Sequence, residues 1–381
     1  MKIGIDARAL IGPRTGIGRF LEEFVRTLEG RYNQHHFILY APRPLSFTPA
    51  DPTVTVRVEP GIRGIKGAIW LQTYLPSLAR RDGLDVFWGP MFHLPVLLSS
   101  EVSAVVTVHD LVYRFFPRTM RPSNYWLMKA LFRLSLWRAQ HVTVDSHAVS
   151  RDLRHMVPIP ARKPVTVVYP GVSQAFRPHD PDEARRAVAD TFGLSGSYLL
   201  TVATLEPRKN LHTLIKAVAS LPESVRKRRP LVVVGGAGWN NSSLWEAAAP
   251  LVSEGSVRFL GYVADERLAW LYAAAVLFVF PSVYEGFGLP VAEAMACGLP
   301  AVVSDIPVMH EVAERAALFA PPGNPDAWAE VILQAVEDER QRGIMREAGL
   351  ARAREFRPAK SAQLMMSVLE RPGHEVAHAP S

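Results

Sequence analysis

Cysteine is almost absent from this sequence, which contains only Cys297 among its 381 residues. A single cysteine excludes an internal disulfide framework and any zinc site built from cysteines, and it is typical of a reducing compartment. Asp180 and Asp182 form an Asp-x-Asp string, but the string lies in a predicted linker and not after a strand, so we attribute it to chance. The sequence predicts no metal site and no cofactor.

Long apolar runs are absent as well. The longest uncharged one, Leu268–Tyr284, is too short for a membrane span and contains Pro281. It is better explained by a helix, Asp265–Ala274, followed by a buried strand, Val276–Phe280. The N-terminus has no apolar core before Asp6, unlike a signal peptide. We therefore expect a cytoplasmic protein, either soluble or peripheral on the inner face of the membrane.

Acidic residues are scarce in the first half of the chain. The net charge is +7, but residues 1–175 hold 22 Lys and Arg against 12 Asp and Glu, whereas residues 176–381 hold 21 against 24. Such a surplus could serve nucleic acid, an anionic membrane or a phosphorylated substrate.

The densest basic segment, residues 113–141, has no acid. Its cations are Arg114, Arg118, Arg121, Lys129, Arg133 and Arg138, among seven aromatic residues that include Trp126 and Trp137. A helix of this composition could lie on a membrane surface, stack single-stranded nucleic acid, or be a core helix with its cations outward. Arg63 and Lys66 add charge on a predicted loop.

Short apolar, β-branched runs alternate with amphipathic stretches along the chain. The expected strands of the first half are Ile3–Asp6, Phe37–Ala41, Val54–Val58, Val86–Trp88, Ala104–Val108, Val142–Asp145 and Val165–Val168. Those of the second half are Tyr198–Ala203, Leu231–Val234, Val257–Leu260, Val276–Phe280, Ala301–Ser304 and Leu318–Ala320. The helical patterns include Gly18–Leu28, Ala68–Ala79, Ser123–Arg138 and Ala148–Met156. Continuous apolar strands separated by helices predict parallel sheets buried on both faces.

This pattern predicts an α/β protein of two doubly wound, Rossmann-like domains facing a cleft. The expected domains are residues 1–175 and 176–357, joined by a proline-rich linker, Gly171–Asp182. A terminal helix at 358–370 is expected to pack back toward the first domain, and residues 371–381 to be a disordered tail. Ligands bind at the carboxyl ends of such sheets, with phosphate at a helix N-terminus.

The segment PSVYEGFGLPVAEAMACGLPAVVSD, residues 281–305, follows a predicted strand. Gly288 permits close backbone approach, and Pro290 indicates the start of a helix whose free N–H groups form an anion site. Glu285 and Glu293 lie before and within that helix, and carboxylates accept hydrogen bonds from vicinal hydroxyl groups. The arrangement suits a nucleotide sugar. Alternatively, Glu293 only interacts favourably with the helix dipole in the first turn, and Glu285 is a loop acid that binds no ligand.

This segment resembles the Glu-x7-Glu signature of retaining glycosyltransferases with the GT-B fold, specifically glycosyltransferase family 4. The resemblance extends over about residues 1–370. It implies that Glu285 lies near the donor sugar and that Glu293 binds the ribose hydroxyls. It also implies sugar and diphosphate contacts from the main chain around Phe287, Gly288 and Leu289, and an acceptor site in the first domain.

A second segment, TVATLEPRKNLHTLIKAV, contains Arg208 and Lys209 where a helix is predicted to begin. The helix dipole disfavours two cations there unless an anion is bound, and a diphosphate would resolve the conflict; a solvated pair is the alternative. The resemblance implies that Lys209 grips the donor diphosphate. Many members carry an arginine where this chain has Thr204, and Arg208 could substitute for it.

A glycine-rich segment, GPRTGIGRFLEEF, follows the first strand, but Leu21 replaces the last glycine of G-x-G-x-x-G, which disfavours a dehydrogenase. The family has at this place a loop that closes over the diphosphate and meets the acceptor. The residues that match it are Gly16, Ile17 and Gly18.

His109 lies just past the strand Ala104–Val108, at a carboxyl end where function is favoured over structure. The resemblance places it beside the anomeric region of the donor, with Asp110 either orienting it or capping the next turn. Gly235 follows a later strand and could offer backbone to the base or diphosphate, and the resemblance implies that main-chain groups near Tyr262 read the nucleobase; a purely structural role is the alternative for both.

The resemblance implies a retaining glycosyltransferase that moves a hexose from a nucleoside-diphosphate sugar to a glycan or lipid-diphosphate-linked glycan, without metal. The strings TGIGRF and TLEPRKN look most like mannosyltransferases of surface-polysaccharide synthesis, which indicates GDP-mannose; rhamnose and glucose stay open. The basic first half is then expected to serve the acceptor or its membrane, and not nucleic acid. The rivals are a nucleotide-sugar epimerase and a polyanion-binding protein.

Overall fold

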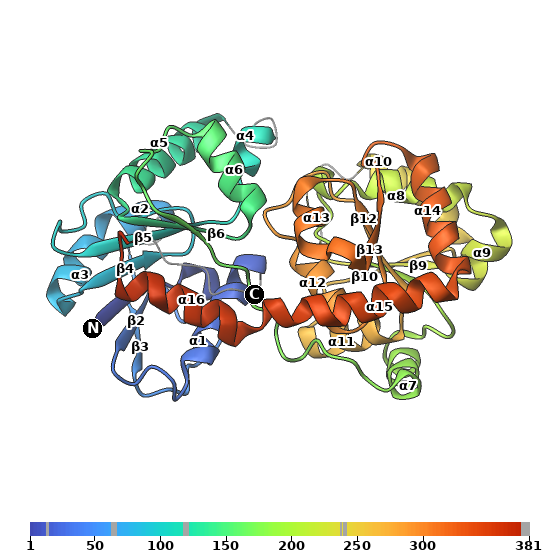
Figure 1. Ribbon diagram of the computed structural model, residues 1–381, viewed down its shortest axis with the longest axis horizontal. Helices are drawn as coiled ribbons and strands as arrows, with labels where there is room; N and C mark the ends of the chain where they lie inside the picture. The colour runs from blue at the N-terminus through green and yellow to red at the C-terminus, as the bar shows by residue number, and fades with distance from the viewer. Residues whose placement is uncertain (13–14, 62–66, 117–121, 237, 239–241, 375–381) are drawn as a thin grey trace. The chain divides into compact units, whose positions relative to one another are not determined.

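The computed structural model describes residues 1–12, 15–61, 67–116, 122–236, 238 and 242–374. The chain forms two compact units, one of Met1–Gly171 with Pro358–Ser381 and one of Val172–Arg357 (Figure 1). The first boundary therefore lies at Gly171 and not at residue 175. The expected tail forms a turn up to His374, and its remainder lies outside the described residues.

A parallel sheet with the strand order β3-β2-β1-β4-β5-β6-β7 is the centre of the first unit. Its strands are β1 (Lys2–Asp6), β2 (His36–Ala41), β3 (Val54–Val58), β4 (Val86–Gly89), β5 (Ser103–Val108), β6 (His141–Val144) and β7 (Val165–Val167). Ile3 is in register with Phe37 on one side and with Val86 on the other. The order reverses between β1 and β4, which defines a doubly wound sheet.

Helices cover both faces of this sheet, with α1 and α16 on one side and α5 on the other in Figure 1. The helices are α1 (Gly16–Leu28), α2 (Gly67–Thr73), α3 (Leu75–Asp82), α4 (Val112–Phe115), α5 (Pro122–Arg138), α6 (His147–Met156) and α16 (Pro358–Glu370). The single helix predicted at 68–79 is two helices, because Pro76 lacks an N–H and its ring would clash with the carbonyl of Gln72.

The last helix, α16, packs on α1. Met365, Met366 and Leu369 of α16 are buried in the same core as Phe20 and Phe24 of α1. The first unit therefore takes part of its core from the C-terminal end of the chain.

The second unit has its own parallel sheet, in the order β10-β9-β8-β11-β12-β13. Its strands are β8 (Leu199–Val202), β9 (Leu231–Val234), β10 (Val257–Gly261), β11 (Leu277–Phe280), β12 (Ala301–Ser304) and β13 (Ala317–Ala320). Its helices are α7 (Pro181–Phe192), α8 (Leu211–Ser220), α9 (Glu223–Arg228), α10 (Ser242–Ser253), α11 (Asp265–Ala274), α12 (Leu289–Ala296), α13 (Pro307–Ala313), α14 (Pro325–Glu337) and α15 (Glu339–Ala353). The order reverses between β8 and β11, so this sheet is also doubly wound.

The Asp-x-Asp string begins a helix and does not lie in an irregular linker. Asp180 is the N-cap of α7, and its Oδ1 accepts hydrogen bonds from the N–H groups of Asp182 (3.0 Å) and Glu183 (2.9 Å). An aspartate followed by Pro181 is a typical helix start. The linker expected to reach Asp182 therefore ends before Pro181.

Candidate active site

The loop between β11 and α12 carries the first part of the candidate site. Gly288 precedes α12 with φ +97°, and a Cβ atom on it would lie 2.5 Å from Cε of Met309. Glycine is favoured here by its backbone conformation, whereas the Met309 methyl group is the end of a flexible side chain that could move away. The same loop, which follows the carboxyl end of β11 at Phe280, carries Glu285.

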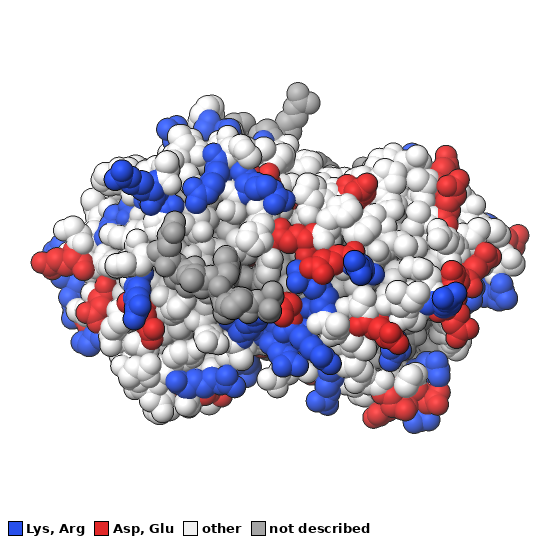
Figure 2. Space-filling model, viewed as in Figure 1, with Lys and Arg blue, Asp and Glu red and all other residues white. Residues whose placement is uncertain are grey.

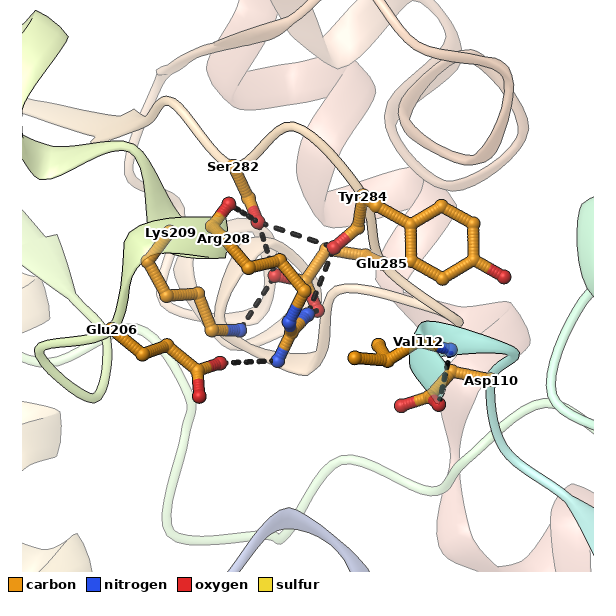
Figure 3. A network of polar contacts seen from close by, with 8 residues as sticks. All are labelled: Asp110, Val112, Glu206, Arg208, Lys209, Ser282, Tyr284 and Glu285. Atoms are coloured by element: carbon orange, nitrogen blue, oxygen red, sulfur yellow. Dashed lines mark hydrogen bonds and ion pairs between the residues drawn. The ribbon is translucent and has the colours of Figure 1, made fainter. Parts of the chain in front are cut away.

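The Glu285 carboxylate accepts three hydrogen bonds from side chains. Oε1 accepts from Nζ of Lys209 (2.5 Å) and from Oγ of Ser282 (2.6 Å), and Oε2 accepts from Nη1 of Arg208 (2.8 Å). Figure 3 shows these three side chains converging on the carboxylate. Burial by itself would raise the pKa of Glu285, but Lys209 and Arg208 outweigh it and lower the pKa to about 2. Glu285 is therefore ionised at neutral pH, and a proton-donating role is excluded.

Arg208 is held by a second carboxylate. Its Nη2 donates to Oε1 of Glu206 at 2.6 Å, and its Nη1 also donates to the main-chain oxygen of Tyr284 at 2.8 Å. The network of Glu206, Arg208, Glu285 and Lys209 thus pairs two cations with two carboxylates. Glu206 was not among the predicted site residues, although an acid two residues before an arginine in a tight turn is a signal for it.

The sequence predicted that a helix begins at the two cations, but in the structure they lie just before the helix. Arg208 and Lys209 lie in a 3₁₀ turn, Pro207–Lys209, and α8 begins only after Asn210, whose φ is +55°. Their charges are balanced by Glu285 and Glu206, so a bound anion is not needed to resolve a conflict with the helix dipole. An arriving diphosphate would instead compete with the Glu285 carboxylate for them.

Glu293 lies in the core of the second unit. It is 1% exposed on α12, and its Oε2 accepts a hydrogen bond from Oη of Tyr272 at 3.0 Å. Burial, with a contribution from Glu293, raises the pKa of the Cys297 thiol, which keeps this cysteine protonated. Phe287 is also buried, with its ring edge-on to Phe356 at 5.1 Å. The implied ligand contacts of Phe287, Gly288 and Leu289 therefore depend on main-chain atoms.

The loops after β8, β9 and β10 lie together at the same edge of this sheet. The N–H of Gly235 donates to the oxygen of Gly261 at 2.8 Å, and a Cβ atom on Gly235 would lie 1.9 Å from the oxygen of Ala203. Thr204 follows Ala203, and Tyr262, which is exposed, follows Gly261. Thr204, Gly235 and Tyr262 are thus neighbouring loop residues, as expected for the carboxyl ends of adjacent parallel strands. Ala237 and Trp239 of the same motif lie outside the described residues.

In the first unit, His109 is buried and both of its ring nitrogens are engaged. Nδ1 lies 2.7 Å from Oδ2 of Asp145 and Nε2 lies 2.6 Å from the main-chain oxygen of Pro90. Burial alone would lower the pKa of His109, but the contacts with Asp145 and Pro90 raise it above its ordinary value. Since both partners are acceptors, the geometry favours the doubly protonated ring, which cannot act as a general base.

Asp145, at the end of β6, therefore orients His109, and the sequence analysis had not named it. Asp110 caps the next turn instead, since its Oδ1 accepts from the N–H of Val112 at 3.0 Å (Figure 3). From the sequence, Asp110 could either orient His109 or cap the next turn. The signal for Asp145 was the position of an acid at the carboxyl end of the strand next to β5.

The glycines of the third motif form the first turn of α1, which begins two residues earlier than predicted. Thr15 is the N-cap, and its Oγ1 accepts from the N–H of Gly18 at 3.2 Å. A Cβ atom on Gly18 would lie 2.7 Å from the oxygen of Ala9, whereas Gly16 is exposed with open space around it. Gly18 is thus needed for packing, and Gly16 and Ile17 lie at the helix N-terminus.

Two negative findings apply to the described part of the chain. Within it, no group of three or more His, Cys, Asp or Glu side chains is placed to hold a metal ion. None of the helices in the described ranges combines the length and the apolar character needed to cross a bilayer. Arg63, Lys66, Arg118 and Arg121 lie outside these ranges.

Comparisons with known proteins agree with this architecture. Residues 14–176 match a family model described as "Glycosyltransferase Family 4", and residues 192–352 match one described as "Glycosyl transferases group 1". The O-antigen chain mannosyltransferase B of Escherichia coli is 33% identical over 373 residues, which cover 93% of this chain and 96% of that protein. The O-antigen chain mannosyltransferase RfbU of Salmonella typhimurium is 30% identical over 60% of this chain and 59% of its own length.

Solved structures share the fold. WaaG, a glycosyltransferase involved in lipopolysaccharide biosynthesis, superposes with a TM-score of 0.79 at 17% identity, over 97% of this chain and all of that one. Sucrose-phosphate synthase from Thermosynechococcus elongatus gives 0.77 at 20% identity, over 97% and 98% of the two chains. The two sheets and these likenesses define a glycosyltransferase of the GT-B fold. Within that class, the chain belongs to glycosyltransferase family 4.

Proposed function

We propose that this glycosyltransferase moves mannose from GDP-mannose to a glycan or a lipid-diphosphate-linked glycan in surface-polysaccharide synthesis, with retention at the anomeric carbon. The relatives named as O-antigen mannosyltransferases support the sugar and the pathway. The network around Glu285 is the structural observation that carries the proposal, because it places two cations at the carboxyl edge of a doubly wound sheet, where phosphates bind.

The chemistry assigned to this network is electrostatic. Negative charge grows on the leaving diphosphate as the glycosyl bond breaks, and cations held in place beforehand stabilise it without having to reorganise. Arg208 is fixed by Glu206 and by the oxygen of Tyr284, so it can donate to a phosphate without moving far. In this proposal, the two cations and the N–H groups at the start of α12 stabilise the diphosphate without a metal or another cofactor.

Glu285 is assigned the task of positioning. In the ligand-free protein the two cations lower the pKa of this carboxylate to about 2, so Glu285 meets the donor in its ionised form and has no proton to deliver to the leaving group. It can orient Lys209 and Arg208 and accept a hydrogen bond from a sugar hydroxyl. Retention then depends on a same-face reaction in which the leaving diphosphate helps to deprotonate the acceptor hydroxyl.

The first unit is assigned to the acceptor, and the enzyme to the cytoplasmic side of the membrane. Its surplus of positive charge suits an acceptor that carries a lipid diphosphate, and it also suits peripheral contact with an anionic bilayer.

A thermal-shift panel tests the donor. A ligand that binds the native state raises the apparent melting temperature, so GDP and GDP-mannose should raise it more than the corresponding UDP and dTDP compounds. Transfer of mannose to a lipid-linked acceptor, followed by NMR of the anomeric configuration, should show an α-linked product. Stabilisation by UDP or dTDP sugars alone would replace mannose with glucose or rhamnose.

A further inference from the structure

The outward face of α5 is apolar, which is unusual for a surface helix. Phe132, Ser135 and Leu136 are buried, so they define the inward face. The residues Trp126, Ala130, Arg133, Leu134 and Trp137 recur at helical spacing on the other face and are all exposed. A helix that covers a soluble domain normally presents a polar outward face. Here Trp126 is 63% exposed and Trp137 is 75% exposed.

Two segments linked to α5 by hydrogen bonds carry further exposed apolar side chains. The loop after β4 carries Leu97, which is 75% exposed, and is attached to α5 by the bond from the N–H of Leu94 to Oγ of Ser135 at 2.9 Å. Gln72 of α2 holds the same loop, donating to the oxygen of Leu94 at 2.9 Å and accepting from the N–H of Val96 at 2.8 Å. Ile69, one turn before Gln72, is 43% exposed. We call Ile69, Leu97, Trp126, Leu134 and Trp137 the apolar surface.

Cations are interspersed with the apolar surface. Arg133 is exposed between the two tryptophans, and Nζ of Lys129 lies 4.8 Å from the centre of the Trp126 ring. The α5 sequence contains no acid, and the nearby loop Pro90–Val102 contains one, Glu101. Lys and Arg side chains gather along the edge of this unit where Figure 1 places α5 (Figure 2).

The C-terminal end of α5 is held rigidly. Nη2 of Arg138 donates to the oxygens of Ser99 (2.6 Å) and Val102 (2.8 Å). Nζ of Lys163 donates to the oxygens of Leu136 (2.6 Å) and Trp137 (3.1 Å), which are free carbonyl groups of the last helical turn. These bonds fix the backbone of Trp137, so its exposed ring is presented by an ordered element and not by a flexible end.

We propose that the apolar surface, with Lys129 and Arg133, docks the enzyme on the interfacial region of a bilayer that contains anionic lipids. Tryptophan rings partition into the headgroup region, aliphatic side chains enter the acyl boundary, and Lys and Arg pair with lipid phosphates. The helix would lie in the plane of the membrane and would not cross it. The docking rests on the peripheral membrane contact proposed above and assigns it to a surface, and it does not depend on which sugar is transferred.

Two other occupants fit the surface less well. A second copy of this chain, docked face to face, would bring Lys129 and Arg133 of both copies together, and like charges in contact are destabilising. Single-stranded nucleic acid would stack on the tryptophans, but Leu97, Leu134 and Ile69 offer no stacking face. Exposed aliphatic side chains beside tryptophan and cations are what an anionic bilayer accommodates.

Co-sedimentation of the full-length protein with vesicles tests the proposal. One set contains phosphatidylcholine with about one third phosphatidylglycerol, and the other contains phosphatidylcholine alone. We expect strong binding to the anionic set only. The double variant Trp126→Ala/Trp137→Ala should reduce the partition coefficient at least about tenfold, because it removes apolar area that enters the lipid. Lys129→Ala/Arg133→Ala should reduce it about twenty-fivefold, or roughly fivefold for each cation.

Matched controls come from α15 of the second unit. Ile344→Ala removes an aliphatic side chain that is 51% exposed, and Arg340→Ala removes an exposed cation; both should bind vesicles like the wild type. Sugar transfer to a water-soluble acceptor should be unchanged in all four variants, so a failure of the proposed reaction would be seen separately. Equal vesicle binding by the wild type and the tryptophan variant would refute the proposal. So would a dimer, or retention of single-stranded nucleic acid, that the same substitutions abolish in place of vesicle binding.

Discussion

Replacing Glu285 by glutamine should destabilise the second unit and at the same time strengthen its binding to a diphosphate. The pKa of Glu285 falls from an ordinary 4.5 to about 2, which corresponds to about 3 kcal/mol of stability at neutral pH. Because the folded pKa is the lower one, this contribution is complete above about pH 5 and is lost as the pH falls from about 4.5 to about 2. In a domain of this size, about 3 kcal/mol lowers the melting temperature by roughly 6–12 °C.

Scanning calorimetry of the wild type and Glu285→Gln at neutral pH and near pH 3, with and without GDP, measures both effects. The melting temperatures should differ most at neutral pH, and the difference should fall to about half or less near pH 3, because the contribution is fully lost only below about pH 2. GDP should stabilise the variant more than the wild type, since Lys209 and Arg208 no longer share their charge with a carboxylate. Transfer should nevertheless be lost, because the cations are no longer positioned. A variant as stable as the wild type at neutral pH, or one that GDP no longer stabilises, would contradict this account of the network.

Three further predictions concern the charged pairs. Lys209→Ala should reduce transfer at least about a hundredfold with an unchanged circular dichroism spectrum; full activity would remove Lys209 from the site. Glu206→Gln should lower kcat about tenfold by releasing Arg208, with partial rescue by Glu206→Asp, whereas a merely structural role would change only the melting temperature. Asp145→Asn should cost the first unit about 3 kcal/mol and convert His109 from the doubly protonated to the neutral ring, as read by nitrogen NMR. The folded pKa of His109 is raised, so its contribution to stability is present below about pH 6.5 and is lost as the pH rises through that folded value.

The strands of both sheets could be predicted from the sequence to within one residue at each end, because continuous apolar runs such as Leu231–Val234 have no other stable environment. Helix boundaries were less predictable where proline intervened. The pattern around Pro76 predicts one helix where the structure has two. The segment around Asp180 and Pro181 predicts an irregular linker where the structure has a capped helix start. In both places, local backbone chemistry overrides hydrophobic periodicity.

The candidate site was predictable by position but not by pairing. The ends of β8 and β11 indicated Lys209 and Glu285 separately, since each follows a strand of the same sheet. Their direct contact, and the presence of Glu206 beside Arg208, depends on distances between loops that no spacing in the chain encodes. The same holds for His109, whose partner Asp145 lies 36 residues away, just after the neighbouring strand β6.

Helix α16 belongs to the first unit although it follows the second unit in the chain, and this order has a consequence for biosynthesis. The N–H of Val172 donates to the oxygen of Phe356 at 2.7 Å, so the chain enters and leaves the second unit at adjacent points. On the ribosome, most of the first unit is therefore synthesised before the second unit, but its core is complete only after α16 (residues 358–370) has followed the second unit out. Until then, the apolar side chains of α1 that pack against α16 are uncovered in the nascent chain, while residues 172–357 can already close around their own core.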